Sequence, residues 1–520
     1  MNIKRAKEEI KNAIEAYLLK DEWGEYAIPA IRQRPVLLMG PPGVGKTQIM
    51  EQIARECGIG LVAYTITHHT RQSAVGLPFI EKKRYGGREY SVTEYTMSEI
   101  VASVYDKIEK TGLKEGILFI DEINCVSETL APTMLQFLQC KTFGSHKIPE
   151  GWLIAAAGNP PEYNKSVREF DVATLDRIKM IQIEPDLGVW KEYAVRENIH
   201  PSILSYLGIK GQYFCSIETT VDGKLFATPR GWEDLSQLLR VYETLGKGAD
   251  RDVIGQYLQH PKISKDFANY LELYYKYQNE YQVEEILDGV IREDLCSRVA
   301  KAPFDERLSV AGLLLSKLAE GFRELRIQNQ VMEQLMEALK EYKESLDKNQ
   351  SEDTETDQMQ QSTGEDAPVN PGERMEELRF RLEEGRKVRR KQGLLSRGQE
   401  RILRRVEAIL ECYGKALKTL SFTGTEEVWQ WVREHFMEES DRYESMKDRC
   451  GSRLEHAFDF MEASFGNGQE MVIFVTELNT GEASVRFLNE YQCDRYYRYN
   501  KELLFDRQEQ ELRQRIGGQS

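Results

Sequence analysis

Residues 35–50 read PVLLMGPPGVGKTQIM, and this stretch decides the fold. An apolar run comes first, a glycine-rich segment follows, and an amphipathic helix pattern begins at its end. The middle segment matches the pattern G-x-x-x-x-G-K-S/T, and its residues are Gly40, Pro41, Pro42, Gly43, Val44, Gly45, Lys46 and Thr47. The order strand, loop, helix is the context that a phosphate-binding loop requires. The sequence therefore predicts a nucleotide site here.

The residue types of this loop fit the chemistry of a bound triphosphate. Gly43 and Gly45 let the backbone turn tightly and approach phosphate oxygens without a Cβ clash. The amides of a helix N-terminus then surround the phosphate, where the helix dipole also favours negative charge. Lys46 is expected to reach the β- and γ-phosphates, and the Thr47 hydroxyl is expected to ligate Mg²⁺. Gln48, the next residue, is assigned to the same nucleotide site.

A second motif lies at the end of another apolar run, in ILFIDE at 117–122. Four apolar residues predict a buried strand, and Asp121 and Glu122 then emerge at its carboxyl end, where ligands bind in open α/β sheets. We expect Asp121 to hold Mg²⁺ and Glu122 to orient and deprotonate the attacking water. A second carboxylate in this position favours hydrolysis over a simple switch.

Apolar runs alternate with helical patterns through the first 185 residues, which predicts an α/β fold with a five-stranded parallel sheet between helices. The expected strands cover 35–40, 60–67, 116–123, 151–159 and 179–185. Two interruptions, at 77–95 and 141–149, predict β-hairpins inserted beside the sheet. We expect residues 1–185 to form the nucleotide-binding domain.

The rest of the chain divides by composition. Residues 186–346 show helical periodicity, which predicts a helical lid followed by a long exposed helix or coiled-coil arm. Residues 207–224 follow no regular pattern. Residues 347–373 are acidic and polar, which predicts a disordered linker. Residues 374–520 are expected to form a mainly helical domain of unknown role, in which 470–478 fits either a strand or a short buried helix.

Composition narrows the classes of protein. The chain has 520 residues and a net charge of −15, which argues against a protein that coats nucleic acid through bulk charge. No apolar run reaches the roughly 18 residues of a membrane span. The eight cysteines are scattered without a C-x-x-C pair, so no zinc framework or disulfide scaffold is expected, and the cytoplasm is the expected compartment. The basic run RKVRRK at 386–391 lacks interleaved aromatics, which favours a solvated or intramolecular helix face over RNA or DNA binding.

Taken in order, these motifs resemble the AAA+ ATPases and, within them, the MoxR-like branch. The resemblance covers about residues 35–240. Besides the phosphate-binding loop, it depends on the stretches LFIDEINCVSETLAPTMLQFLQ at 118–139, WLIAAAGNPPEYN at 152–164 and ATLDRI at 173–178. The last departs from the family pattern by Ile178 in place of phenylalanine. In members of the clade, hairpins inserted at these two places face the central pore or a partner.

The resemblance also implies roles for individual side chains. Asn159 stands at the sensor 1 position, where an amide contacts the γ-phosphate and the lytic water. Arg177 matches the arginine finger that reaches a neighbouring subunit's nucleotide, with Arg168 as a competing candidate. Arg230, in ATPR at 227–230, matches sensor 2 at the start of a lid helix.

The activity that the resemblance implies is ATP hydrolysis with Mg²⁺ by a homo-oligomeric ring, expected to be a hexamer. Such a ring acts like a chaperone that remodels or assembles a protein partner, and family members often work with von Willebrand factor A domain proteins. Two alternatives stay open: a nucleic-acid-associated NTPase similar to the McrB type, and a nucleotide-gated scaffold. Glu122 and Asn159 speak against the scaffold. ATP is favoured over GTP mainly by resemblance.

Overall fold

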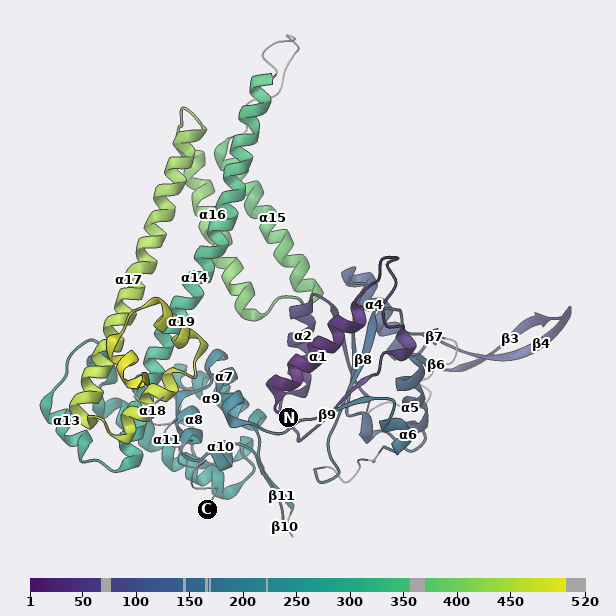
Figure 1. Cartoon of the computed structure of the whole chain (residues 1–520), viewed down its shortest axis with the longest axis horizontal. Helices are drawn as coiled ribbons and strands as arrows, with labels where there is room; N and C mark the ends of the chain where they lie inside the picture. The colour runs from purple at the N-terminus through teal and green to yellow at the C-terminus, as the bar shows by residue number, and fades with distance from the viewer. Residues whose placement is uncertain are drawn as a thin grey trace, which may run out of the picture. The chain divides into compact units, whose positions relative to one another are not determined.

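The structure is a computed structural model that describes residues 1–66, 76–143, 146–163, 167, 170–220, 223–355 and 370–501. The chain forms two compact units (Figure 1). The first contains residues 1–189 together with two later segments, 228–230 and 384–400. The second contains the remaining residues, 190–227, 231–383 and 401–520. The sequence pattern does not predict that these two later segments pack with the first unit.

The first unit is built on the predicted five-stranded parallel sheet, with the order β2-β5-β8-β1-β9. Its strands are β1 (Val36–Met39), β2 (Gly60–Thr65), β5 (Gly116–Asp121), β8 (Trp152–Gly158) and β9 (Lys179–Gln182). Each lies within one of the apolar runs that predicted it. The α/β fold class is therefore confirmed.

Both faces of this sheet are covered, because successive side chains of a strand point to opposite sides. Leu38 of β1 packs with helices α1 and α2, whereas the adjacent Leu37 packs in the core that contains α4 and α5. The helices of the first unit are α1 (Ile3–Leu18), α2 (Lys46–Cys57), α4 (Glu99–Thr111), α5 (Ala131–Cys140) and α6 (Val172–Leu175), with short 3-10 helices η1 (Ala30–Arg32) and η3 (Ile123–Cys125). Burial on two faces explains why the strands are almost continuously apolar.

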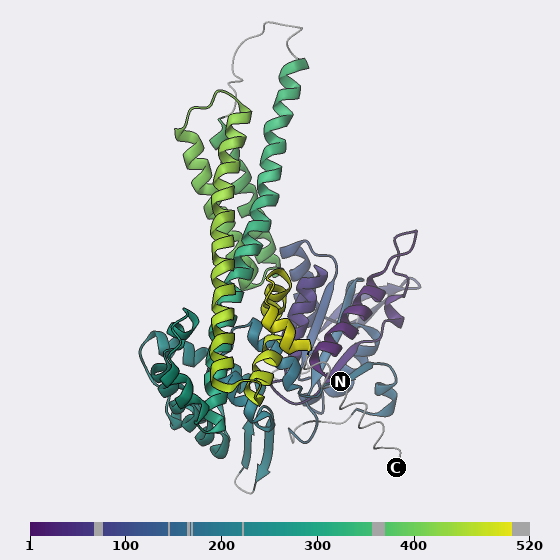
Figure 2. The same cartoon turned by 60° about the vertical axis from the view of Figure 1, so that its left-hand side comes forward.

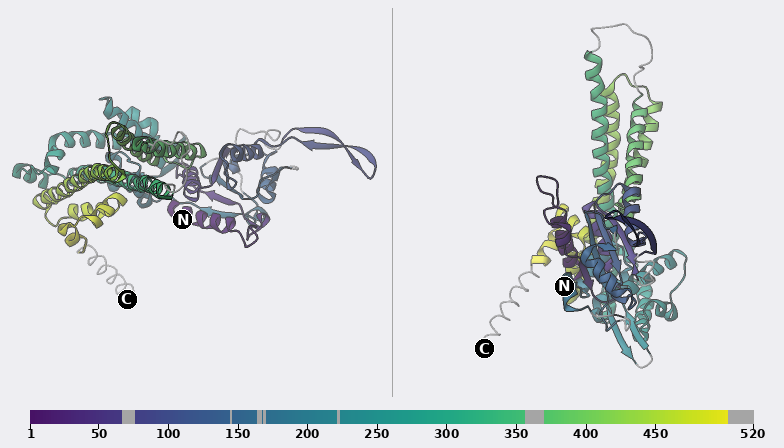
Figure 3. Two further views of the ribbon diagram at one scale, coloured as in Figure 1. Left: turned by 90° about the horizontal axis from the view of Figure 1, so that it is seen from above. Right: turned by 90° about the vertical axis from the view of Figure 1, so that its right-hand side faces the viewer.

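Both predicted hairpins are present. Strands β3 (Pro78–Tyr85) and β4 (Arg88–Tyr95) pair in antiparallel fashion and form a ribbon that extends away from the sheet of the first unit (Figure 3). Their turn is made by Gly86 and Gly87, which both have positive φ. The second hairpin joins β6 (Thr142–Phe143) to β7 (His146–Lys147).

The second unit is mainly helical. Its helices are α7 (Leu187–Arg196), which begins in the first unit, α8 (Pro201–Ile209), α9 (Pro229–Thr244), α10 (Arg251–Tyr257), α11 (Pro261–Tyr281), α12 (Val283–Leu287), α13 (Glu293–Ala300), α14 (Phe304–Glu355), α15 (Pro371–Gln392), α16 (Arg397–Thr419), α17 (Thr425–Phe465), α18 (Gln469–Leu478) and α19 (Glu482–Glu490), with η4 (Gly211–Tyr213). Residues 470–478 are thus helical. The segment expected to be irregular contains a hairpin of β10 (Ser216–Thr220) and β11 (Gly223–Ala227).

Two apolar cores organise these helices. One joins parts of α14, α15, α16 and α17 into a four-helix arm, visible as a long bundle in Figure 2. The other joins α11–α14 to the end of α17 and to α18 and α19. Helix α14 continues to Glu355 and α15 begins at Pro371, so helix extends into both ends of the predicted linker, and residues 356–369 lie outside the described part. No helix among the described residues is long and apolar enough to cross a membrane.

Candidate functional site

Three neighbouring strands deliver the predicted site residues to one edge of the sheet. Strand β8 pairs with β5 on one side and with β1 on the other, and all three run parallel. Their carboxyl ends therefore meet at the same edge. The phosphate-binding loop follows β1, Asn159 follows β8, and the Asp121-Glu122 pair ends β5.

The loop has the backbone that a phosphate site requires. Gly43 and Gly45 have φ values of 80° and 87°, in the left-handed region where a side chain is strained. Helix α2 begins at Lys46, directly after Gly45. Among the described residues, none of the main-chain amides from 43 to 47 donates to a backbone carbonyl. The loop thus offers several free N–H donors at a helix N-terminus, which is a built site for an anion.

The other loop residues hold the turn in place. Gly40 lies so close to β9 that a Cβ would stand 2.7 Å from the Ile183 carbonyl oxygen. The Pro41 side chain is buried, Pro42 is half-buried, and Val44 packs against the core beneath α1 and α2. Gln48 is exposed on the first turn of α2.

Lys46 is buried at the centre of this edge, with 8% of its surface exposed. Its Nζ donates to the carbonyl oxygens of Gly40 and Pro41 at 2.9 and 2.8 Å, and to Asn159 Oδ1 at 3.0 Å. Burial lowers the pKa of Lys46 to about 8, while the charge of Asp121 opposes this shift and that of Arg230 adds to it. No carboxylate lies within ion-pair distance of this ammonium among the described residues, so an incoming polyphosphate would supply its missing counter-charge.

Asp121 is held in place from two sides. The Thr47 hydroxyl donates to Asp121 Oδ2 at 2.9 Å, and the Glu122 amide donates to Asp121 Oδ1 at 2.9 Å. Glu122 has a φ of 57°, in the left-handed region. Such a conformation costs a non-glycine residue about 1–3 kcal/mol and is typical of functional positions. The two predicted acids are therefore adjacent in sequence but differ in surroundings.

The pair of Thr47 and Asp121 fits a magnesium ion. Hydroxyl and carboxylate oxygens are the ligands that Mg²⁺ takes in proteins, where it keeps several waters and is bound by one or two carboxylates and substrate phosphates. Both side chains stand at the edge where the free amides point. When bound, Mg²⁺ neutralises charge on the β- and γ-phosphate oxygens.

Asn124 is a site residue that the sequence analysis did not single out. It is 2% exposed, and its Nδ2 donates to the Asn159 carbonyl oxygen at 2.8 Å, which fixes the backbone at Asn159. Its Oδ1 has no hydrogen-bond partner among the described residues. A Cβ on Gly158 would stand 2.6 Å from this oxygen, so only glycine fits before Asn159. The motif DEIN at 121–124 contained the signal, because it places an amide side chain two residues after the acids at a strand end.

Arg230 also reaches the loop, through the segment 228–230 that returns to the first unit. An added Cβ on Gly43 would lie 3.1 Å from the Thr228 hydroxyl and 3.3 Å from Arg230 Cβ. The guanidinium is close enough to influence the pKa of Lys46. Thr228 was not predicted and forms this close contact with the loop.

Arg177 lies elsewhere on the first unit. Its side chain is exposed, and its Nη1 donates to Gln139 Oε1 at 2.8 Å on α5. None of its hydrogen bonds or ion pairs in the described structure involves the loop, Asp121, Glu122 or Asn159. The competing candidate Arg168 lies outside the described residues.

Fold and site together define a P-loop nucleotide site, and the comparisons agree. Residues 36–175 match the model of the ATPase family associated with various cellular activities (AAA). This part of the chain is therefore an AAA ATPase domain. The match ends before α7, so it does not extend to the helical unit.

Curated relatives match this chain over a stretch of similar length. A mouse protein named ATPase family gene 2 protein homolog B is 29% identical over 143 residues, which are 26% of this chain and 16% of the relative. The bovine protein of that name is 31% identical over 123 residues, or 24% and 12% of the two chains. The chain thus spans less than a fifth of the length of these relatives. Among solved structures, a RuvB mutant from Thermotoga maritima aligns with 19% identity and a TM-score of 0.27, covering 50% of this chain and 69% of that one.

Proposed function

We propose that this protein binds ATP with Mg²⁺ and hydrolyses it at the edge formed by the loop, Asp121, Glu122 and Asn159. The junction of Lys46 with Asn159 supports this most directly, because it brings the expected γ-phosphate ligand within 3.0 Å of the expected sensor amide. In the proposed reaction, the loop amides and Lys46 bind the phosphates, and Glu122 accepts a proton from the water that attacks the γ-phosphorus. Asn159 orients that water. The bond from the γ-phosphorus to the β–γ bridging oxygen breaks, and ADP leaves with that oxygen.

We further propose that several copies assemble into a ring, as a MoxR-like AAA+ machine that remodels or assembles a protein partner. The exposed Arg177 supports this arrangement, since it is available to complete the site of a second copy. The β3–β4 ribbon supports contact with a protein, because its exposed side chains include Phe79, Ile80, Tyr85 and Tyr90. From the resemblance to the MoxR-like branch, we propose a partner with a von Willebrand factor A domain and a cytoplasmic location.

A nucleic-acid-associated function is the second candidate, favoured by the basic segment around α15. However, basic side chains of this segment form ion pairs with carboxylates of the same chain. Arg386 is 8% exposed and lies 3.5 Å from Glu400, and Arg390 donates to the same carboxylate at 3.0 Å. These pairs favour a role in packing over phosphate contact.

The substitution Glu122→Gln tests hydrolysis. It keeps the side-chain size but removes the base, so ATP turnover should fall by about 10²–10⁴-fold while ATP affinity stays within a few-fold of the parent protein. Steady-state phosphate release and nucleotide titration measure the two quantities. Glu109→Gln, an exposed position on α4, is the matched control. Unchanged turnover in the Glu122 variant would rule out its role as the base.

A further inference from the structure

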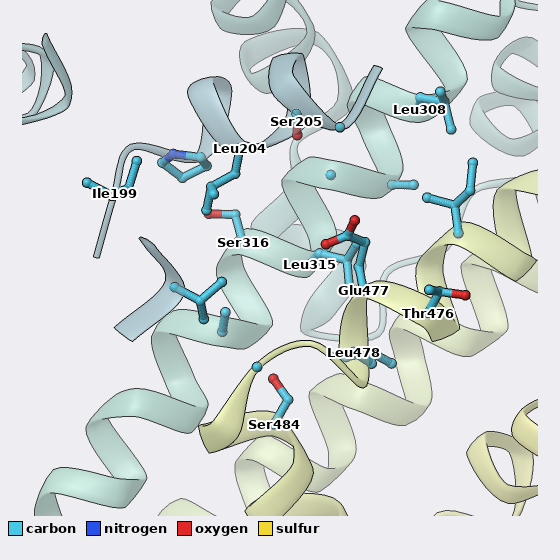
Figure 4. A pocket seen from close by; sticks show the side chains of 18 of the residues that line it. Ile199, Leu204, Ser205, Leu308, Leu315, Ser316, Thr476, Glu477, Leu478 and Ser484 are labelled. Atoms are coloured by element: carbon cyan, nitrogen blue, oxygen red, sulfur yellow. The ribbon is translucent and has the colours of Figure 1, made fainter. Parts of the chain in front are cut away.

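The second unit contains a cavity of about 280 Å³ (Figure 4). Its walls come from α8, from the first half of α14, and from α18 with the start of α19. Two of these walls, α14 and α18, belong to one apolar core. No motif in the sequence marks this place.

Most of the lining is apolar or small. Leu204 of α8 and Leu315 of α14 lie on two sides of it, and Ser316 of α14 faces Leu204 (Figure 4). Ala319 continues the α14 wall one turn further. A volume of 280 Å³ lies between the roughly 150 Å³ that accommodates benzene and the range of about 300–1,000 Å³ of drug-sized ligand sites. The cavity therefore fits a small apolar body.

Two arginines give this cavity a charge. Arg323 Nη1 donates to the Val195 carbonyl oxygen at 3.0 Å, and Arg240 Nε donates to the Asn198 carbonyl oxygen at 2.7 Å. Arg323 thus binds the last turn of α7 and Arg240 binds the segment that follows it, and both arginines line the cavity. Within the described residues neither forms an ion pair with a carboxylate. Burial lowers the pKa of Arg323, the charge of Glu320 opposes this shift, and the charge of Arg240 adds to it.

The one carboxylate in the lining is already neutralised. Glu477 of α18 points into the space between α18 and α14 (Figure 4), and Lys191 Nζ lies 2.5 Å from its Oε1. The cavity wall therefore carries two cations without a carboxylate partner and one acid that has its own lysine. This balance favours an anion.

We propose that the cavity binds a small amphiphile whose apolar body packs between α8, α14 and α18 and whose carboxylate or phosphate head contacts Arg323 and Arg240. Arginine suits this head, because its planar fork of donors binds two oxygens of a carboxylate or phosphate at once. Arg240 Nη2 also donates to Asn198 Oδ1 and to the Ile199 carbonyl oxygen, so its Nη1 is the nitrogen left for the head, whereas Arg323 uses only Nη1 for its backbone bond. The chemistry of the site is thus that of a medium-chain fatty acid or alkyl phosphate.

Calorimetric titration of the full chain without nucleotide tests the proposal, with decanoate, decyl phosphate, decan-1-ol and decylamine as probes. We expect one equivalent of decanoate or decyl phosphate to bind, and the alcohol and amine to bind at least about tenfold more weakly, since they lack the head that pairs with arginine. Failure of both anions to bind, or equal binding of all four probes, would overturn the proposal.

Two pairs of variants locate the site. Ser316→Phe fills the cavity and should abolish binding, whereas Ser316→Ala leaves the space open and should preserve it. Arg323→Met removes one cation and should weaken decanoate by about 10- to 100-fold. Arg326→Met, which removes a cation from the next turn of α14 that pairs with Glu482 at 3.0 Å instead, should have no such effect. Helical circular dichroism verifies that each variant is folded, and decanoate binding that survives Ser316→Phe would contradict the assignment.

Discussion

The loop edge of the sheet and the surface around Arg177 belong to the same unit, but only the loop edge brings several of the predicted site residues together. At the loop edge, residues from three strands and from the segment 228–230 meet within hydrogen-bond or van der Waals distance. Arg177 is exposed, and its guanidinium bonds to Gln139 instead. In the proposed function, one chain therefore supplies the residues that bind the triphosphate, while the exposed Arg177 acts on the nucleotide of a second copy.

The two regions should therefore respond differently to substitution. Residues of the loop edge should act within a single chain, on nucleotide binding or on the chemical step. Arg177 should act between chains. Substitutions at the two places therefore give different results in mixtures of variants.

Arg177→Ala should have the largest effect. An arginine finger contributes about 10³–10⁵-fold to turnover, so phosphate release should fall by about 10³-fold or more with little change in ATP affinity. The exposed Arg32, also in the first unit, provides the control Arg32→Ala. Mixing Arg177→Ala with Lys46→Met should restore part of the activity, because each chain supplies what the other lacks. Absence of any recovery in the mixture would leave Arg177 without a role between chains.

Asn159→Ala should have the next largest effect. Loss of one preorganised polar contact to a reacting centre costs about 10²–10³-fold in turnover. Asn124→Ala, which removes the hydrogen bond to the Asn159 backbone, should cost only about 3- to 10-fold, because it acts through position. Turnover and ATP affinity of both variants measure this gradation. Equal losses would mean that Asn124 contacts the nucleotide itself.

A pH effect on ATP affinity should be smaller. The pKa of Lys46 is about 8 in the nucleotide-free site because burial disfavours its charge. A bound triphosphate favours the charged form and raises that pKa, so binding takes up a proton above about pH 8. Affinity should be constant below this pH and should fall by up to about tenfold per unit above it. Titrations between about pH 7 and 9.5 check this, and an affinity that does not fall would mean that Lys46 keeps its proton throughout.

Much of the first unit follows from the sequence, because its signals are local. The strand before Gly40 and the acids after β5 can each be recognised from neighbouring residues, and parallel pairing then brings the strand ends together. Asn124 and Thr228 were missed, since their roles depend on contacts with Asn159 and Gly43 across the fold. The β10–β11 hairpin was not predicted either, because its short strands are mostly half-exposed and show no clear alternation of buried and exposed residues.

The second unit was less predictable than the first. The long helix α14 follows from its periodicity, whereas residues 470–478 of α18 fitted either a strand or a helix. The cavity among α8, α14 and α18 depends on tertiary packing of segments about 270 residues apart in places. Arg240 and Arg323 belong to ordinary helical patterns, and nothing in their sequence neighbours marks them as lining one cavity. Periodicity indicates that a residue is on a helix, whereas a shared cavity requires the packed structure.

The most direct test of the account is equilibrium titration of Mg·ATP into the parent protein, Lys46→Met and the exposed control Lys114→Met. Removal of a charged hydrogen-bond donor that is buried against the bound phosphates should weaken ATP by about 10- to 100-fold or more. The control should bind as the parent protein does. Equal ATP affinity in all three proteins, each with parent-like circular dichroism, would contradict the claim that the loop around Lys46 holds the triphosphate.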